Sequence, residues 1–239
     1  MAHSFEPVKP TEAPGGAAAV DRALALLGAF RGGDAALSLA ELAQRTGLYK
    51  STALRLLASL EHASLVQKLD AGGYVLGCEV ARLHSIYSAS FSLDRVVLPV
   101  LKDLVKATNE SAAYHVRRGD ARLCMYRVDS PQPVRDHIRA GDMLPLARGS
   151  GGRILSAYDP ELARAAPPRD RRVLAQTREQ GYFASVGDRL AEVAGISAPV
   201  FHADGRIAAS LTLTMPSHRY DERYVKLVLQ AARRLTGQV

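Results

Sequence analysis

The chain has 239 residues, 47% of them hydrophobic, which is enough apolar material to fill two cores of ordinary size. The formal net charge is +7 at pH 7, but residues 1–90 hold 8 Lys/Arg against 8 Asp/Glu, whereas residues 91–239 hold 23 against 16. All of the excess positive charge therefore lies in the second part of the chain. This excludes an argument for nucleic-acid binding from bulk charge in the first part, where affinity would depend on individual cations.

Several classes of protein are disfavoured by what the sequence lacks. Cys78 and Cys124 are far apart and outside any CxxC spacing, so neither a disulfide framework nor a zinc module is indicated. We predict no metal site and no cofactor, and no catalytic residues, because no carboxylate pair or Ser/His/Asp set stands out. Residues 1–18 are rich in Pro and Gly, which favours a disordered tail over a signal peptide. No apolar run is long enough for a membrane span, and we expect a cytoplasmic protein.

In chain order, the first strong pattern is a pair of short helices. Ser38 followed by Glu41 forms a capping-box sequence that predicts a helix start, and Gly47 suits a left-handed helix end. The second helix carries an apolar face and, opposite it, a polar face with Ser51 and Arg55. Two such helices bury their apolar faces against each other and a third element, which we expect Ala23, Leu24 and Leu27 to supply.

A short hairpin is predicted next, from residues 65–69 and 74–76 with a glycine turn between them. Helix, turn, helix and hairpin in this order are typical of a winged-helix DNA-binding domain, in which the second helix enters the major groove. Ordinary core packing would explain the helix pair alone equally well, but the added hairpin favours DNA binding. The residues that we expect to contact DNA are Arg22, Ser38, Tyr49, Lys50, Ser51, Thr52, Arg55, Lys68 and Gly73.

The next helix, from Glu79 to about Ala89, is predicted to link two domains. Its apolar positions Val80, Leu83 and Tyr87 need a partner, and a second copy of the chain is the economical one because a dimer can address a two-fold DNA site. We therefore expect a homodimer, with a dimer of dimers left open.

The second half of the chain reads as an α+β domain. We predict a helix over 93–108, then strands over 112–116, 122–128 and 134–139, and later a hairpin of 195–203 and 206–215 around the two residues Asp204-Gly205. A helix is expected from Asp221 to about Thr236, and a helix opening at Ile154-Leu155 should follow a glycine-rich loop over 144–153.

Two features of this half indicate a ligand site. The glycine-rich loop lets backbone amides approach a bound anion at the start of a helix, although, taken alone, the loop is better explained as a plain glycine-rich turn. On the later hairpin, Ser210, Thr212 and Thr214 alternate with leucines, so that a row of hydroxyls either faces water or lines a polar pocket. His115 and Cys124 are isolated, and we expect structural roles for them.

With these residues in view, the chain from about Ala18 to Val239 resembles the IclR family of bacterial transcriptional regulators. The resemblance rests on residues 19–24, 39–43 and 47–52 in the first domain and on 144–146, 181–182 and 196–201 in the second. It departs from the family pattern at Tyr49, where the family often has Pro, at Arg153, where it has Lys, and at Gly187-Asp188-Arg189.

The resemblance implies a winged helix-turn-helix over 19–77, a linker helix over 78–91 and a GAF-like, antiparallel-sheet effector-binding domain over 92–239. It implies a regulator of a catabolic operon that binds a palindromic operator in double-stranded DNA and a small organic or aromatic acid, of which we favour a carboxylate. The implied effector-binding residues are Leu144, Leu146, Ser150, Gly151, Ser185, Gly195, Thr212 and Thr214. Two alternatives stay open: a small-molecule enzyme with a winged-helix appendage, and a thiol-based sensor that acts through Cys124 or Cys78.

Overall fold

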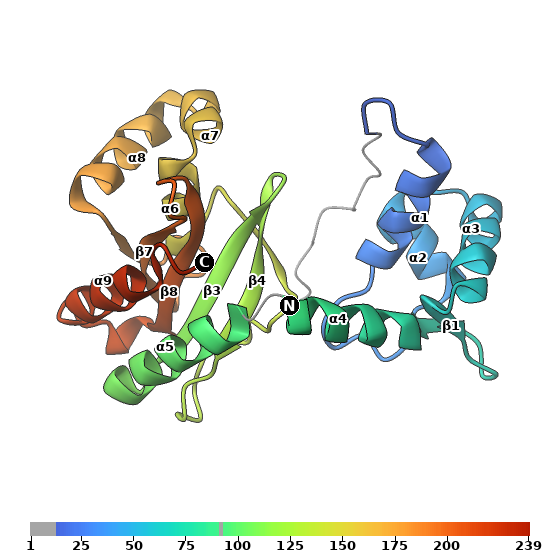
Figure 1. Cartoon of the computed structure of the whole chain (residues 1–239), viewed down its shortest axis with the longest axis horizontal. Helices are drawn as coiled ribbons and strands as arrows, with labels where there is room; N and C mark the ends of the chain where they lie inside the picture. The colour runs from blue at the N-terminus through green and yellow to red at the C-terminus, as the bar shows by residue number, and fades with distance from the viewer. Residues whose placement is uncertain (1–12, 91–92) are drawn as a thin grey trace. The chain divides into compact units, whose positions relative to one another are not determined.

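The computed structural model describes residues 13–90 and 93–239, so most of the tail expected over 1–18 lies outside the described residues. The chain divides into two compact units, one up to residue 91 and one from residue 92 (Figure 1). Within the described ranges, no helix is long and apolar enough to cross a lipid bilayer.

The first unit is a three-helix domain with a two-stranded hairpin and a following helix. Its elements are α1 (Ala18–Gly28), α2 (Leu39–Thr46), α3 (Lys50–His62), β1 (Val66–Lys68), β2 (Tyr74–Leu76) and α4 (Cys78–Ser90). The winged-helix prediction is confirmed.

Local sequence signals explain where α2 begins and ends. The Ser38 hydroxyl accepts a hydrogen bond from the Glu41 amide at 3.2 Å, and the Glu41 carboxylate accepts one from the Ser38 amide at 2.8 Å. This reciprocal capping box satisfies amides that have no partner within the helix. At the other end, Gly47 adopts φ +69°, a left-handed conformation that glycine tolerates best. Both expectations from the sequence are confirmed.

The core of this unit forms where the three helices meet. Leu26, Leu42 and Leu57 are fully buried there, together with Tyr74 from the hairpin. The expectation that Leu24 joins this core is wrong: its side chain is 56% exposed, because α1 turns its Leu26 face inward. Ala23 and Leu27 pack at the edge of the core as expected.

The second unit is built around a six-stranded antiparallel sheet in the order β5-β4-β3-β8-β7-β6. Its strands are β3 (Ser111–Arg118), β4 (Ala121–Val128), β5 (Met143–Pro145), β6 (Phe183–Val186), β7 (Val193–Phe201) and β8 (Ile207–Pro216). Its helices are α5 (Leu93–Thr108), α6 (Ser150–Tyr158), α7 (Pro160–Ala165), α8 (Pro168–Gln180), the short 3-10 helix η1 (Ser217–Arg219) and α9 (Tyr224–Leu235).

The two faces of the sheet differ in chemistry because side chains alternate along each strand. On β8, Leu211 and Leu213 face α5 and α9 in the large apolar core. The alternate residues, Ser210 and Thr212, lie on the face covered by α6. The hydroxyl row is therefore buried in the protein and does not face water.

Two predictions about the strands of this unit need correction. Residues 134–139 are not a strand: β5, at Met143–Pro145, is the strand that pairs with β4, and the segment before it is held by a buried ion pair between Arg127 and Asp136. The hairpin after β7 has a longer loop than two residues, since the Gly205 amide donates to the His202 carbonyl and Gly205 adopts φ +82°.

Two helix starts also differ from the predictions. The helix α6 begins at Ser150, so that Gly151 and Gly152 lie inside its first turn instead of in a preceding loop. The last helix begins at Tyr224 and not at Asp221, because the Asp221 carboxylate bonds the Arg223 amide at 2.9 Å and shapes a turn before the helix.

Candidate functional site

The exposed face of α3 carries the residues predicted to contact DNA. Ala53, Leu57 and Leu60 of this helix are buried against the core, which leaves Lys50, Ser51 and Arg55 exposed on the other side. Thr52 is half-buried beside them, and Tyr49 at the helix start is 85% exposed. The N-terminal half of α3 thus presents hydroxyls and two cations to solvent, as an α-helix in the major groove requires.

The remaining residues of the predicted DNA surface lie on other elements of the same unit. Lys68 is exposed on β1, and Gly73 ends the hairpin turn at φ +88°, with its carbonyl accepting from the Leu69 amide at 3.0 Å. Arg22 is exposed on α1. The Ser38 hydroxyl is engaged with Glu41 in the capping box, so its structural role is to fix the start of α2. Their contacts with DNA stay predictions.

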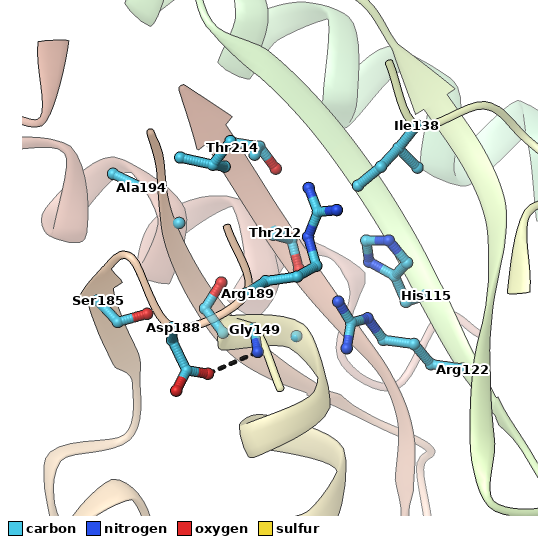
Figure 2. Close-up of a pocket in the computed structure, with 14 residues that line it drawn as sticks. His115, Arg122, Ile138, Gly149, Ser185, Asp188, Arg189, Ala194, Thr212 and Thr214 are labelled. Carbon is cyan, nitrogen blue, oxygen red and sulfur yellow. Dashed lines mark hydrogen bonds between the residues drawn. The ribbon is translucent and has the colours of Figure 1, made fainter. Parts of the chain in front are cut away.

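The second unit holds a cavity between the N-terminus of α6 and the polar face of the sheet (Figure 2). Six of the eight predicted effector residues line it: Ser150, Gly151, Ser185, Gly195, Thr212 and Thr214. Leu144 and Leu146 do not. Leu144 is packed instead in a small apolar cluster with Ala113, Cys124 and Ile138, and Leu146 is also buried.

Glycines at the cavity wall are required by close approach. A Cβ atom on Gly151 would lie 2.8 Å from Thr212 Oγ1 and 3.0 Å from Ser210 Oγ, and one on Gly195 would lie 2.5 Å from Ser150 Oγ. Larger residues at these positions would push into the hydroxyls of the opposite wall. The glycine-rich segment therefore allows α6 to begin directly against the polar face of the sheet.

Arg122 is the most unusual residue of the site. Its side chain is buried, and Nη1 donates to the carbonyls of Pro145 at 2.5 Å and Arg148 at 2.6 Å, but Nε has no acceptor. Within the described part of the chain, no carboxylate lies in ion-pair range of it. Burial, together with the charge of Arg189, lowers the pKa of Arg122 to about 10. A buried cation without a carboxylate partner makes the cavity a place where an anion is favoured.

The loop between β6 and β7 contributes two more charged side chains. Asp188 accepts from the Gly149 amide at 2.5 Å and from Arg153 Nη2 at 3.3 Å, which fixes the loop to the start of α6. Arg189 points the other way, into the cavity (Figure 2). It makes a long ion pair with Asp136, whose Oδ2 lies 3.7 Å from Arg189 Nη2, beyond hydrogen-bond distance.

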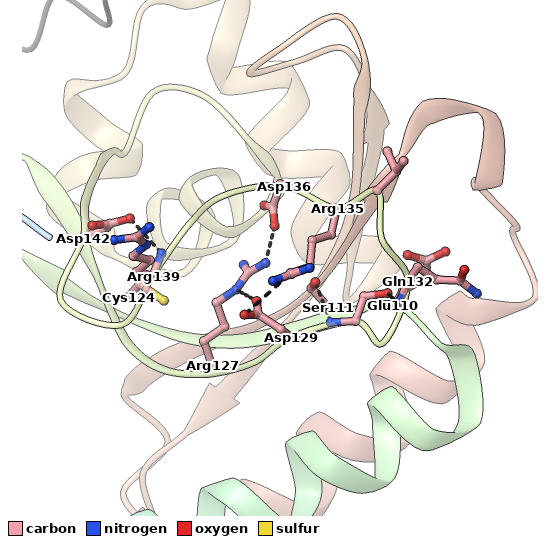
Figure 3. A network of polar contacts seen from close by, with 12 residues as sticks. Glu110, Ser111, Cys124, Arg127, Asp129, Gln132, Arg135, Asp136, Arg139 and Asp142 are labelled. Carbon is pink, nitrogen blue, oxygen red and sulfur yellow. Dashed lines mark hydrogen bonds and ion pairs between the residues drawn. The ribbon is translucent and has the colours of Figure 1, made fainter. Parts of the chain in front are cut away.

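Asp136 belongs to the irregular segment that follows β4 (Figure 3). Its carboxylate is buried and pairs with Arg127, which also binds Asp129 at 2.7 Å. This segment has no strand pairing. It is held instead by hydrogen bonds that involve side chains, such as that from the Ser130 amide to Ser111 Oγ at 3.0 Å. The ion pairs explain why the segment stays ordered without being a strand.

His115 and Cys124 lie side by side in the register of β3 and β4. Burial, and after it the charges of Arg122, Arg127 and Arg189, lowers the pKa of His115 well below 6.5, and neither ring nitrogen has a hydrogen-bond partner. Burial raises the pKa of Cys124 to about 12, so its thiol stays protonated and unreactive at neutral pH.

The sequence did not identify the charged members of this site. His115, Arg122, Asp188 and Arg189 all line the cavity, yet Arg122 lies in an ordinary strand pattern and His115 was assigned a structural role. The one usable signal was the unusual Gly187-Asp188-Arg189 stretch before β7. In the described ranges, no group of three His, Cys, Asp or Glu side chains is placed to hold a metal ion.

Comparisons with known proteins agree with this architecture. The family model described as the IclR helix-turn-helix domain matches residues 19–70, and that of the bacterial transcriptional regulator IclR C-terminal domain matches 86–166 and 165–239. The glycerol operon regulatory protein of Streptomyces coelicolor is 32% identical over 197 residues, which cover 76% of this chain and 78% of that protein.

Solved structures show the same fold. An IclR homolog from Microbacterium hydrocarbonoxydans, crystallised with 4-hydroxybenzoate, has a TM-score of 0.77 at 24% identity and covers 91% of this chain and 97% of its own. An IclR transcriptional regulator from Alicyclobacillus acidocaldarius has a TM-score of 0.79 at 22% identity, with coverage of 93% and 97%. The two family models together span most of the sequence, so this chain belongs to the IclR family of bacterial transcriptional regulators.

Proposed function

We propose that this protein is a ligand-responsive regulator that binds a palindromic operator through α3 and a small-molecule effector in the cavity beneath α6. The observation that carries the proposal is the pairing of an exposed, cationic N-terminal half of α3 with a buried, cationic cavity in the other unit. The first suits DNA, and the second suits a small anion. Because the proposed target is bacterial operator DNA, we expect the protein to act in the cytoplasm.

A homodimer is the form that we propose to bind the operator. Leu83 and Ile86 on α4 are 47% and 50% exposed, and Val20 on α1 is 55% exposed. A second copy of the chain would cover such side chains, and two copies of α3 could then contact two half-sites about one helical turn apart, roughly 34 Å. A ligand that binds one arrangement of the two copies more tightly would shift the population towards it and so change operator affinity.

The relatives support a role in the control of catabolic genes. One of them is a glycerol operon regulatory protein, and a structural neighbour holds 4-hydroxybenzoate, a small acid. An enzyme with a winged-helix appendage has no support from a specific group in the cavity, and the protonated, buried Cys124 does not support a thiol sensor. Turnover of a bound metabolite by the purified protein would favour the enzyme over the regulator.

The test is operator binding by the purified full chain, with the DNA upstream of its own gene as the first probe. Replacing Arg55 by Ala should weaken binding roughly ten- to hundredfold, because one arginine contact to a base or phosphate is worth about 1–3 kcal/mol. Arg118→Ala is the matched control, since it removes the same charge from an exposed position of the second unit. Equal affinity of the Arg55→Ala and Arg118→Ala variants would refute the assignment of α3.

A further inference from the structure

The cavity of the second unit has the chemistry of a site for one class of ligand. We propose that it binds a small hydroxylated oxyanion, a carboxylate or phosphate on a short polyol chain, with the oxyanion held against Arg122. This inference rests on the proposed function, because it names the effector class of the same site.

Arg122 is the residue that we expect to bind the charged end of the ligand. Its guanidinium lies against the first turn of α6: a Cβ atom on Gly149 would be 2.9 Å from Arg122 Nη2, and one on Gly151 would be 3.5 Å from Nε. The first-turn amides of a helix have no acceptor within the helix, and their dipoles also favour negative charge. Arg122 Nε, which has no acceptor among the described residues, and the first turn of α6 therefore both favour negative charge in the same part of the cavity. An oxyanion bound there would accept hydrogen bonds from both.

The other end of the ligand would meet the hydroxyl groups of Ser150, Ser185, Thr212 and Thr214, which line the cavity. Ser197 Oγ lies 2.8 Å from both Ser150 Oγ and Thr212 Oγ1, and all three side chains are buried. Ser197 and Ser210 lie behind this lining and do not themselves line the cavity. Hydroxyls both donate and accept, so this lining matches ligand hydroxyl groups better than methylene groups, which would cover the Ser185 and Thr214 hydroxyls without bonding to them.

The lining argues against an aromatic acid, which the sequence had left open. No Phe or Tyr ring lines the cavity as the structure describes it, and its aliphatic side chains are limited to Ile138, Val193 and Ala194. A phenyl ring placed here would contact buried hydroxyls and guanidinium groups without satisfying them, and each such unmet group costs free energy. The ligand that we propose is therefore polar along its whole length.

Room for this ligand depends on Arg189. The cavity measures about 30 Å³, enough for about two water molecules at most, and the Arg189 side chain extends across it (Figure 2). Among the residues that the structure describes, Arg189 makes a long ion pair of 3.7 Å with Asp136, and its Nη2 has no hydrogen-bond acceptor there. Binding requires Arg189 to move, and a ligand oxyanion within reach of Nη2 provides the acceptor that it lacks.

The experiment is calorimetric titration of the full chain with matched small probes. Glycerate, glycerol 3-phosphate and gluconate carry both an oxyanion and hydroxyls; glycerol lacks the charge, propionate lacks the hydroxyls, and 4-hydroxybenzoate carries a ring. We expect at least one of the first three to bind, at least tenfold more tightly than glycerol, propionate or 4-hydroxybenzoate. Whether glycerate or glycerol 3-phosphate binds more tightly distinguishes a carboxylate from a phosphate ligand.

Two variants test whether these side chains contribute to ligand binding. Arg122→Met should weaken the best probe roughly tenfold or more, since a charged hydrogen bond is lost. Thr214→Val should weaken it less, because this change removes one hydroxyl of the lining and keeps the volume of the side chain. Arg118→Met at an exposed position is the charge control and should bind like the unaltered chain.

Failure of all three hydroxylated oxyanions to bind, or tighter binding of 4-hydroxybenzoate, overturns the proposal, as does undiminished binding by the Arg122→Met variant. Operator binding measured on the same preparation separates this result from failure of the proposed function. If the protein binds its operator but none of the three probes, the proposed function is supported and the proposed ligand class is refuted. If it binds no operator, the proposed function falls whatever the cavity binds.

Discussion

Replacing Arg122 by Met should weaken ligand binding roughly tenfold or more, with only a moderate change in the stability of the second unit. Arg122 is 3% exposed, and its pKa lies at about 10 instead of 12.5. Each pKa unit corresponds to about 1.4 kcal/mol, so keeping the charged form in this place costs the folded state about 3 kcal/mol. Met fills a similar volume without that cost.

The substitution also removes favourable contacts. The two hydrogen bonds from Nη1 to the carbonyls of Pro145 and Arg148 are each worth about 1.5–3 kcal/mol for a charged donor. The loss of about 3–6 kcal/mol thus equals or exceeds the gain of about 3 kcal/mol, and the free energy of unfolding should fall by no more than about 3 kcal/mol.

The assay is urea denaturation followed by circular dichroism, with and without the best-binding oxyanion from the titration. At a ligand concentration of about 100 times the Kd of the unaltered protein, that protein should gain about 2.7 kcal/mol, and the Arg122→Met variant, which binds at least tenfold more weakly, about 1.4 kcal/mol or less. A loss of more than about 4 kcal/mol in the ligand-free variant would show that Arg122 is chiefly structural. A ligand-induced gain equal to that of the unaltered protein would refute its role in binding.

Two further predictions concern the buried histidine and the start of α2. The pKa of His115 lies well below 6.5 in the fold, so below pH 6.5 the unfolded chain takes up a proton that the folded chain does not; stability should fall by about 1.4 kcal/mol per pH unit there and be unaffected above it. Denaturation midpoints at pH 5.5–7.5 should show this slope relative to His115→Gln, and parallel curves would contradict it. Replacing Ser38 by Ala should destabilise the first unit by about 1 kcal/mol because the capping box is lost, whereas Ser38→Thr should retain it; thermal unfolding decides between them.

Local sequence signals were sufficient for much of the first unit. The capping box at Ser38, the left-handed Gly47 and the helical spacing of Ala53, Leu57 and Leu60 depend on residues within a few positions of one another, so they are visible in the sequence. Leu24 was misplaced because α1 offers two apolar faces, and only packing against α2 and α3 selects the one that carries Leu26.

The hydroxyl row of the second unit was also determined by the sequence, since alternation along a strand is a local property. Whether that row faced water or a pocket depended on α6 covering that face of the sheet, which no local pattern reveals. The strand predicted over 134–139 failed for a related reason: Arg127 and Asp136 hold that segment by buried ion pairs, and β5 takes its place beside β4.

The charged part of the site was decided by tertiary structure alone. His115, Arg122 and Arg189 come from β3, β4 and the loop before β7, and the strand order β4-β3-β8-β7 together with α6 brings them to one cavity. In the sequence each is an ordinary polar residue, because burial and the absence of a counter-charge are properties of the folded environment. The sequence by itself determined which residues could form helices, strands and a DNA-binding surface, whereas the tertiary structure decided which cations are buried without an anion, since charge burial arises only when distant strands pack together.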